Sequence, residues 1–141
     1  MKTRAVVFAY SEVGVRCLEV LLAGQVEIPL VVTHDDDPNE TRWFASVAEL
    51  ARRYELPCIA PDSAGDPSLV ERVATLAPDF IFSFYYRFLL GEEILRSARR
   101  GALNMHGSLL PKFRGRAPVN SALLHGATET GATMDCTAAR A

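Results

Sequence analysis

Short apolar runs alternate along this 141-residue chain with stretches in which apolar residues recur every three or four positions. An apolar run of about 4–8 residues that is bounded by turn residues is typical of a buried strand. Runs of this kind predict strands at 5–10, 28–33, 57–60, 80–84, 101–105 and 131–136.

The stretches between these strands predict amphipathic helices. The first helix is expected to begin at Ser11, a residue type that caps helix N-termini, and to end at Gly24. Its inward stripe is predicted to contain Val15, Leu18 and Leu22. Further helices are expected over 46–54, from Asp66-Pro67 onward, over 91–97 and from Pro118 to about His125, and a polar loop is expected over 35–42.

Strands that alternate with helices are typical of a right-handed parallel α/β sheet. We therefore expect one Rossmann-like domain over residues 1–141, with a parallel sheet and helices on both faces. Ligands of such sheets bind at the carboxyl ends of the strands. The first strand is followed by S-E-V-G rather than by the glycine-rich dinucleotide motif, and the sequence has no P-loop. A dinucleotide cofactor is therefore not expected.

Composition narrows the class of function further. The net charge of -2 gives no general attraction to nucleic acid. Cys17, Cys58 and Cys136 lack C-x-x-C spacing, so neither a disulfide framework nor a metal site is indicated. The sequence contains no apolar run of membrane-spanning length and no signal-peptide pattern. We expect a cytoplasmic protein that does not insert into a membrane.

The segment 103–118 carries the candidate chemistry. Asn104 and His106 stand at alternate positions of a predicted strand, and period-two geometry would place both side chains on one face. A basic loop that includes Arg114 and Arg116 follows. An amide donor, a titratable imidazole and a basic loop suit a reaction that develops an oxyanion on an anionic substrate.

The ordered pattern N-x-H-x-S-L-L-P-x-x-R-G-x-x-P in this segment resembles the signature loop of the 10-formyltetrahydrofolate-dependent formyltransferases. That family includes glycinamide ribonucleotide transformylase, methionyl-tRNA formyltransferase and the sugar-nucleotide formyltransferases. The resemblance implies that His106 is the catalytic acid/base and that Asn104 stabilises the tetrahedral transition state. It also implies that 10-formyltetrahydrofolate is the formyl donor, that no metal is used, and that the folate is contacted by Phe88, Leu89, Leu90 and Arg116.

A second stretch, P-D-F-I-F-S-F-Y-Y-R at 78–87, resembles one branch of the family. That branch is the formyltransferase domain of bifunctional polymyxin-resistance proteins, which formylates the 4-amine of UDP-4-amino-4-deoxy-L-arabinose in lipid A modification. Two alternatives remain open. The acceptor could be another amino-sugar nucleotide or methionyl-tRNA, or the chain could be an inactive folate- or nucleotide-binding remnant.

The C-terminal segment departs from the family pattern. The family's catalytic aspartate, which orients the histidine, would fall immediately after Ala141, and the family usually has a histidine where Asp135 stands. The chain is therefore interpreted as incomplete at its C-terminus, with poor activity as the expected result. A carboxylate supplied by Asp135 is disfavoured, because each residue of offset along a strand moves it by about 3.3 Å.

The remaining polar and aromatic residues allow less specific interpretations. A Ser108–His106 hydrolase is disfavoured because the G-x-S-x-G elbow is absent. His34 is interpreted, like His125, as a structural or surface residue. Tyr85 and Tyr86 are interpreted either as packing residues with solvated hydroxyls or as sugar-nucleotide contacts.

Overall fold

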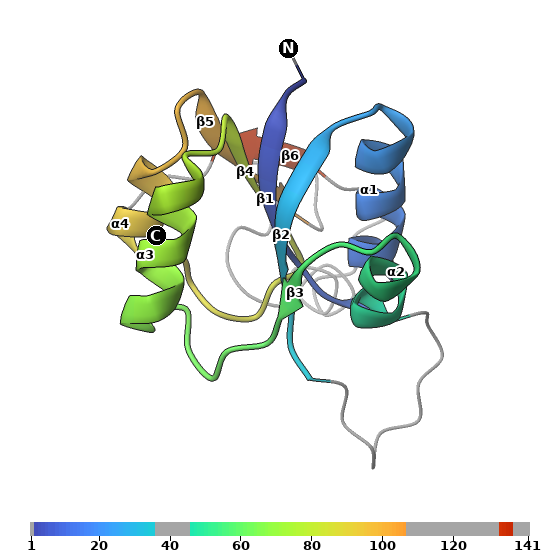
Figure 1. The fold of residues 1–141 in the computed structure, drawn as a ribbon, viewed down its shortest axis with the longest axis horizontal. Helices are drawn as coiled ribbons and strands as arrows, with labels where there is room; N and C mark the ends of the chain where they lie inside the picture. The colour runs from blue at the N-terminus through green and yellow to red at the C-terminus, as the bar shows by residue number, and fades with distance from the viewer. Residues whose placement is uncertain (1, 36–45, 107–132, 137–141) are drawn as a thin grey trace, which may run out of the picture.

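The computed structural model describes residues 2–35, 46–106 and 133–136. These residues form one sheet with the strand order β3-β2-β1-β4-β5-β6 (Figure 1). The first five strands are mutually parallel. Their bounds are β1 (Arg4–Ala9), β2 (Glu27–Val32), β3 (Cys58–Ile59), β4 (Phe80–Phe84), β5 (Gly101–His106) and β6 (Thr133–Cys136).

Strand β6 pairs with β5 in the antiparallel sense, whereas an all-parallel sheet was expected. The prediction of a strand near 131–136 is confirmed over Thr133–Cys136, but its direction was not predicted. An antiparallel strand can start at the end of the sheet where β5 stops. A parallel strand would first require the chain to cross back to the other end of the sheet. The fold class itself, a Rossmann-like α/β sheet, is confirmed.

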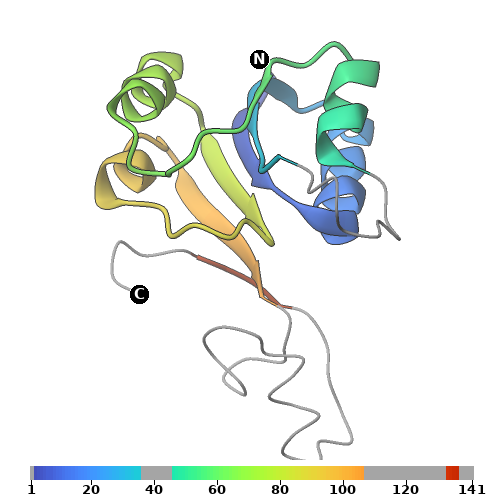
Figure 2. The same ribbon diagram turned by 90° about the horizontal axis from the view of Figure 1, so that it is seen from below.

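Four helices cover the sheet in the described residues: α1 (Ser11–Ala23), α2 (Val47–Arg53), α3 (Pro67–Leu76) and α4 (Glu92–Arg96). Figure 2 shows α1 and α2 on one face and α3 and α4 on the other. Each pair packs on its own apolar cluster. One cluster contains Val15 of α1 and Leu50 of α2, and the other contains Val73 of α3 and Ile94 of α4. No helix among these residues is both long and apolar enough to cross a membrane.

Strand β1 is buried on both faces of the sheet, which explains why its sequence is almost continuously apolar. Ala5, Val7 and Ala9 pack into the cluster under α1 and α2, while Val6 and Phe8 pack into the cluster under α3 and α4. All five side chains are fully buried. A central strand of a parallel sheet is covered on both faces, so the alternation of polar and apolar residues disappears.

Two helices begin at or next to the residues predicted to start them, whereas the first helix has a different cap from the one predicted. Asp66 caps α3, and its carboxylate accepts a hydrogen bond from the Ser68 N–H at 2.9 Å. Ser46 caps α2 through the Glu49 N–H. The prediction that Ser11 caps α1 is wrong. Tyr10 is the N-cap, and Ser11 is the first helical residue, with a left-handed φ of 65°.

The predicted end of α1 at Gly24 is confirmed. The predicted helix from Pro118 to His125 lies outside the described residues, as does most of the predicted loop over 35–42.

Candidate functional site

The candidate site lies where β1 and β4 end side by side. After β1, the chain continues to β2 and β3 on one side of the sheet. After β4, it continues to β5 on the other side. The strand order therefore reverses between β1 and β4, which makes these two strands the topological switch point of the sheet. Open α/β sheets bind their ligands outside the carboxyl ends of the strands at this point. The Tyr10 N–H donates a hydrogen bond of 3.0 Å to the Phe84 carbonyl and joins the two strand ends.

Both strand ends continue into strained backbone. Ser11, after β1, has a φ of 65°, and Tyr85, after β4, has a φ of 59°. A left-handed conformation at a residue other than glycine costs about 1–3 kcal/mol and persists only where surrounding contacts impose it. Such residues cluster at ligand-binding and catalytic sites. The strain therefore supports the switch point as the functional edge.

Residues 85–90, called here the 85–90 loop, contain three of the predicted folate contacts. Phe88 and Leu89 present apolar side chains to the surface, with exposed fractions of 37% and 82%. Leu90 instead is partly buried and packs against the cluster under α3 and α4. The loop therefore presents the exposed apolar side chains of Phe88 and Leu89, while Leu90 attaches the loop to the core.

His34, two residues beyond Val32 at the end of β2, contacts this loop. Its Nε2 accepts a hydrogen bond of 2.9 Å from the Arg87 backbone N–H. Its ring stacks on Tyr86, with a centroid separation of 4.4 Å, and meets the Phe88 and Tyr10 rings edge-on at 4.7 and 5.2 Å. His34 thus has a structural role, as the sequence indicated, but its contact with the 85–90 loop could not be seen in the sequence.

The electrostatic surroundings of His34 favour the neutral imidazole. Burial lowers its pKa most, the Arg87 cation lowers it further, and Asp35 acts in the opposite direction. The Arg87 guanidinium lies over the Tyr10 ring at 4.8 Å from the centroid, within cation–π distance.

Tyr86 is a packing residue of this cluster. Its hydroxyl is buried and has no hydrogen-bond partner among the described residues, and burial raises its pKa to about 12. The interpretation that gave Tyr86 a solvated hydroxyl is therefore wrong. Tyr85 is more open, with 39% of its surface exposed.

The predicted catalytic positions lie on the neighbouring strand. Asn104 is half-buried in β5 and pairs in register with Ser83 of β4, and His106 is the last residue of β5. Because β4 and β5 are parallel, β5 ends at the same edge as the 85–90 loop, about 4.8 Å away across the ladder. The His106 side chain and all of Arg116 lie outside the described part of the structure.

The register of β6 bears on the alternative carboxylate. Asp135 stands opposite Asn104, whereas His106 stands opposite Thr133. The Asp135 backbone is therefore two residues along the strand from the position that faces His106, which is about 7 Å.

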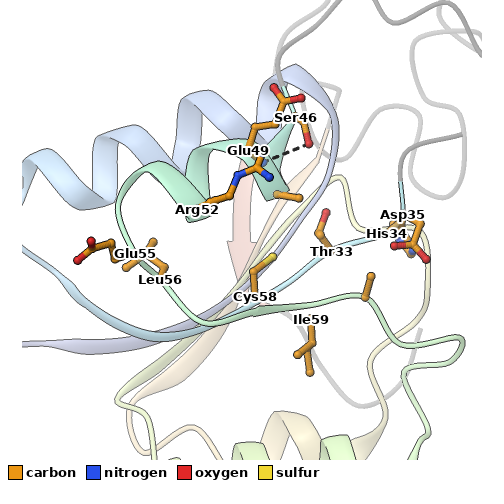
Figure 3. Close-up of a pocket in the computed structure, with 12 residues that line it drawn as sticks. Thr33, His34, Asp35, Ser46, Glu49, Arg52, Glu55, Leu56, Cys58 and Ile59 are labelled. Carbon is orange, nitrogen blue, oxygen red and sulfur yellow. Dashed lines mark hydrogen bonds between the residues drawn. The ribbon is translucent and has the colours of Figure 1, made fainter. Parts of the chain in front are cut away.

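A cavity of about 700 Å³ lies between α2 and the strands β2 and β3, and His34 is one of the residues that line it (Figure 3). Thr33, Ser46, Glu49, Arg52 and Cys58 are among its lining residues. The Thr33 hydroxyl is buried and without a hydrogen-bond partner in the described residues. β1 and β4 separate this cavity from β5, so it does not adjoin Asn104.

The described residues contain no cluster of three or more histidine, cysteine or acidic side chains that could hold a metal ion. Cys17 and Cys58 are free and half-buried, and burial raises the pKa of both thiols. A raised thiol pKa reduces the reactive thiolate, so both residues act as small apolar groups.

Comparison with known proteins identifies the family. The formyl transferase family matches residues 3–138. Among similar solved structures, glycinamide ribonucleotide transformylase 1 from Symbiobacterium toebii is 25% identical, with a TM-score of 0.79, and the match covers 98% of this chain and 67% of that one. The corresponding transformylase from Geobacillus kaustophilus is 25% identical, with a TM-score of 0.74 and coverage of 95% and 73%.

A sugar N-formyltransferase from Shewanella sp FDAARGOS_354 shares the fold at 13% identity, with a TM-score of 0.66 and coverage of 96% and 51%. The family match extends over nearly all of the sequence and includes both strand ends of the candidate site as well as the segment after β5. The chain belongs to the formyl transferase family.

Proposed function

We propose that this chain transfers the formyl group of 10-formyltetrahydrofolate to the 4-amine of UDP-4-amino-4-deoxy-L-arabinose. The observation that carries the proposal is the position of Asn104 and His106 at the end of β5, beside the 85–90 loop, in a member of the formyl transferase family. The ends of β4 and β5 place the backbones of Asn104 and His106 at the same end of the sheet as the exposed apolar side chains of the 85–90 loop.

The reaction requires one bond to form and one to break at the formyl carbon. The acceptor amine attacks this carbon, and the carbonyl oxygen becomes an oxyanion. The amide of Asn104 and the protonated imidazole of His106 donate hydrogen bonds to it, and one such donor is typically worth about 10²–10³ in rate. The carbon–nitrogen bond to the folate then breaks as the protonated His106 gives its proton to the folate nitrogen. The neutral imidazole next takes the extra proton from the attacking amine nitrogen and is protonated again, and this general acid/base help is worth roughly 10²–10⁴.

We assign the folate to the 85–90 loop. Exposed Phe88 and Leu89 supply apolar surface for a flat ring, and the loop backbone supplies hydrogen-bonding groups. Arg116 is assigned to the same ligand through its guanidinium donors. No step needs a metal, because the two donors on β5 stabilise the charge that develops.

The choice of acceptor rests on the sequence of β4 and the loop that follows it. The run S-F-Y-Y-R at 83–87 is the feature that resembles the polymyxin-resistance branch. We therefore propose lipid A modification, and with it polymyxin resistance, as the process served. We also propose a cytoplasmic location, which the free thiols of Cys17 and Cys58 support.

Glycinamide ribonucleotide is the second candidate acceptor. The similarity of 25% to two glycinamide ribonucleotide transformylases favours it. Both acceptors present a primary amine on a phosphorylated sugar derivative, so the donor chemistry would be the same.

The test compares acceptors under one set of conditions. Binding of 10-formyltetrahydrofolate is measured by calorimetry, and formyl transfer is then followed with UDP-4-amino-4-deoxy-L-arabinose, glycinamide ribonucleotide and methionyl-tRNA. We expect the highest kcat/KM with the UDP-sugar. A preference for glycinamide ribonucleotide would replace the acceptor, and absence of folate binding would refute the proposed function.

A further inference from the structure

Side chains from two neighbouring strand ends contact the 85–90 loop. Tyr10 and Phe8 meet Arg87 and Tyr86 through their rings, and His34, which follows β2, adds a hydrogen bond to the loop backbone. The imidazole contacts the loop in two ways, by the hydrogen bond from the Arg87 N–H at 2.9 Å and by ring contacts with Tyr86 and Phe88. The loop begins at Tyr85, whose left-handed backbone needs external contacts to persist. His34 supplies contacts to three consecutive residues directly after the strained one.

The hydrogen bond fixes the protonation state of His34. A neutral imidazole has one nitrogen that donates and one that accepts, whereas the protonated ring has no acceptor. Because Nε2 accepts from the Arg87 N–H, the ring proton lies on Nδ1 and the ring is neutral. Protonation of His34 would therefore break this bond and leave a cation beside Arg87.

We propose that His34 is a positioning residue that sets the backbone of Arg87 and Phe88 so that the 85–90 loop can receive the folate. This inference rests on the proposed function, because it takes the 85–90 loop as the folate-binding segment. His34 acts through the loop, and the hydrogen bond is the specific element of that action. Loss of the acceptor should weaken folate binding more than it slows the chemical step.

Two substitutions separate the hydrogen bond from the packing. His34→Phe keeps an aromatic ring for Tyr86 and Phe88 but removes the acceptor. His34→Gln removes the ring but keeps an acceptor, because its side-chain oxygen lies about as far from the backbone as Nε2. A purely structural role would make the Phe variant the milder one. The positioning role makes the Gln variant the milder one.

The effect should also depend on pH. In the part of the chain that the structure describes, the charged groups that act on the His34 ring are Arg87 from the 85–90 loop and Asp35 from its own segment, and the rings of Tyr10, Tyr86 and Phe88 contact it. The cation and the burial oppose protonation, so the hydrogen bond is intact at neutral pH. Folate affinity should fall as acid protonates His34, and His34→Phe should not show this loss.

The experiment measures the loop and the ligand separately. Amide hydrogen exchange at Arg87, followed by ¹⁵N NMR, reports on the hydrogen bond without any ligand. Calorimetry with 10-formyltetrahydrofolate measures the folate Kd. It is carried out from about pH 5.5 to about pH 8, the range in which an imidazole titrates. Tyr54→Ala is the control, since Tyr54 is an exposed aromatic residue at the end of α2 and is not among the rings that contact His34.

For His34→Phe we expect faster exchange at Arg87 and a Kd for folate that is raised roughly 3- to 10-fold, the effect of one neutral hydrogen bond. His34→Gln should restore most of both. Unchanged exchange at Arg87 would overturn the anchoring contact. Faster exchange with an unchanged Kd would overturn the positioning role and leave the proposed function standing.

If the wild-type chain does not bind 10-formyltetrahydrofolate, the proposed function fails and the positioning role fails with it, whereas Arg87 exchange still decides whether the anchor exists. If His34→Phe does not fold, the Gln variant and the wild-type pH series decide the question. A wild-type folate Kd that does not change across this pH range would then count against the inference.

Discussion

The Tyr10 N–H donates to the carbonyl of Phe84 at 3.0 Å and thereby joins the ends of β1 and β4. Each of these two residues directly precedes a residue with a left-handed backbone, Ser11 and Tyr85 respectively. This hydrogen bond therefore connects the two strained turns at the switch point of the sheet. The parallel pairing of β1 with β4, from Ala5–Phe80 to Ala9–Phe84, fixes both strand ends and thereby maintains the strain.

Removal of the proposed transition-state donors should lower the rate of transfer and leave folate binding intact. Asn104→Ala should lower kcat by about 10²–10³, the usual loss for one oxyanion donor. His106→Ala should lower it by roughly 10²–10⁴, because proton transfer is also lost. Single-turnover kinetics and folate calorimetry are the measurements. Turnover like that of the wild type in His106→Ala would eliminate the mechanism.

Arg116→Ala should instead weaken folate binding, because a charged hydrogen-bond donor to an anionic ligand is lost. Charge-assisted bonds are about twice as strong as neutral ones, which sets the expected loss at roughly 10-fold or more in Kd. Arg116→Lys keeps the charge and serves as the matched comparison. A folate Kd that is the same in all three proteins would remove Arg116 from the site.

The sequence was sufficient to predict the arrangement of strands and helices, because each buried run and each helical stripe is a local pattern. The positions of β4 at Phe80–Phe84 and of the α3 cap at Asp66 follow directly from it. Contacts between distant segments are different. The bond between His34 and Arg87 spans 53 positions in the sequence, and no local pattern encodes it. The antiparallel direction of β6 is likewise a property of pairing rather than of the segment.

The close approach of α1 to β1 depends on Gly14. A Cβ atom at this position would lie 3.2 Å from the Ala9 Cβ and 3.2 Å from Val47 Cγ2. Gly14→Val should therefore destabilise the protein by about 1–3 kcal/mol through overpacking. Ala23→Val, at the exposed end of the same helix, is the control for helix propensity. Urea unfolding of the three proteins gives the comparison, and equal losses in both variants would show that the contact is not limiting.

Tyr86→Phe should stabilise the protein. The hydroxyl of Tyr86 is buried without a partner in the described residues, and an unsatisfied buried polar group costs about 1–3 kcal/mol. Removal of the oxygen keeps the ring stacked on His34 and should raise the free energy of unfolding by on the order of 1 kcal/mol. Tyr85→Phe, at the more exposed neighbour, should change it little. A lower stability in Tyr86→Phe would show that the hydroxyl has a partner, such as a bound water.

His34 should make the stability of the fold sensitive to acid. In the folded chain the pKa of His34 lies below its ordinary value of about 6.5, because burial and Arg87 disfavour the charged ring. The unfolded chain therefore binds more protons than the folded chain as the pH falls through this range, and protonation favours unfolding. The contribution of His34 is fully present above about pH 6.5 and is lost progressively toward its folded-state pKa. Denaturant unfolding of the wild type and of His34→Phe across this range isolates the effect. The wild type should lose more stability on acidification than the variant, and parallel pH profiles would show that His34 does not carry this difference.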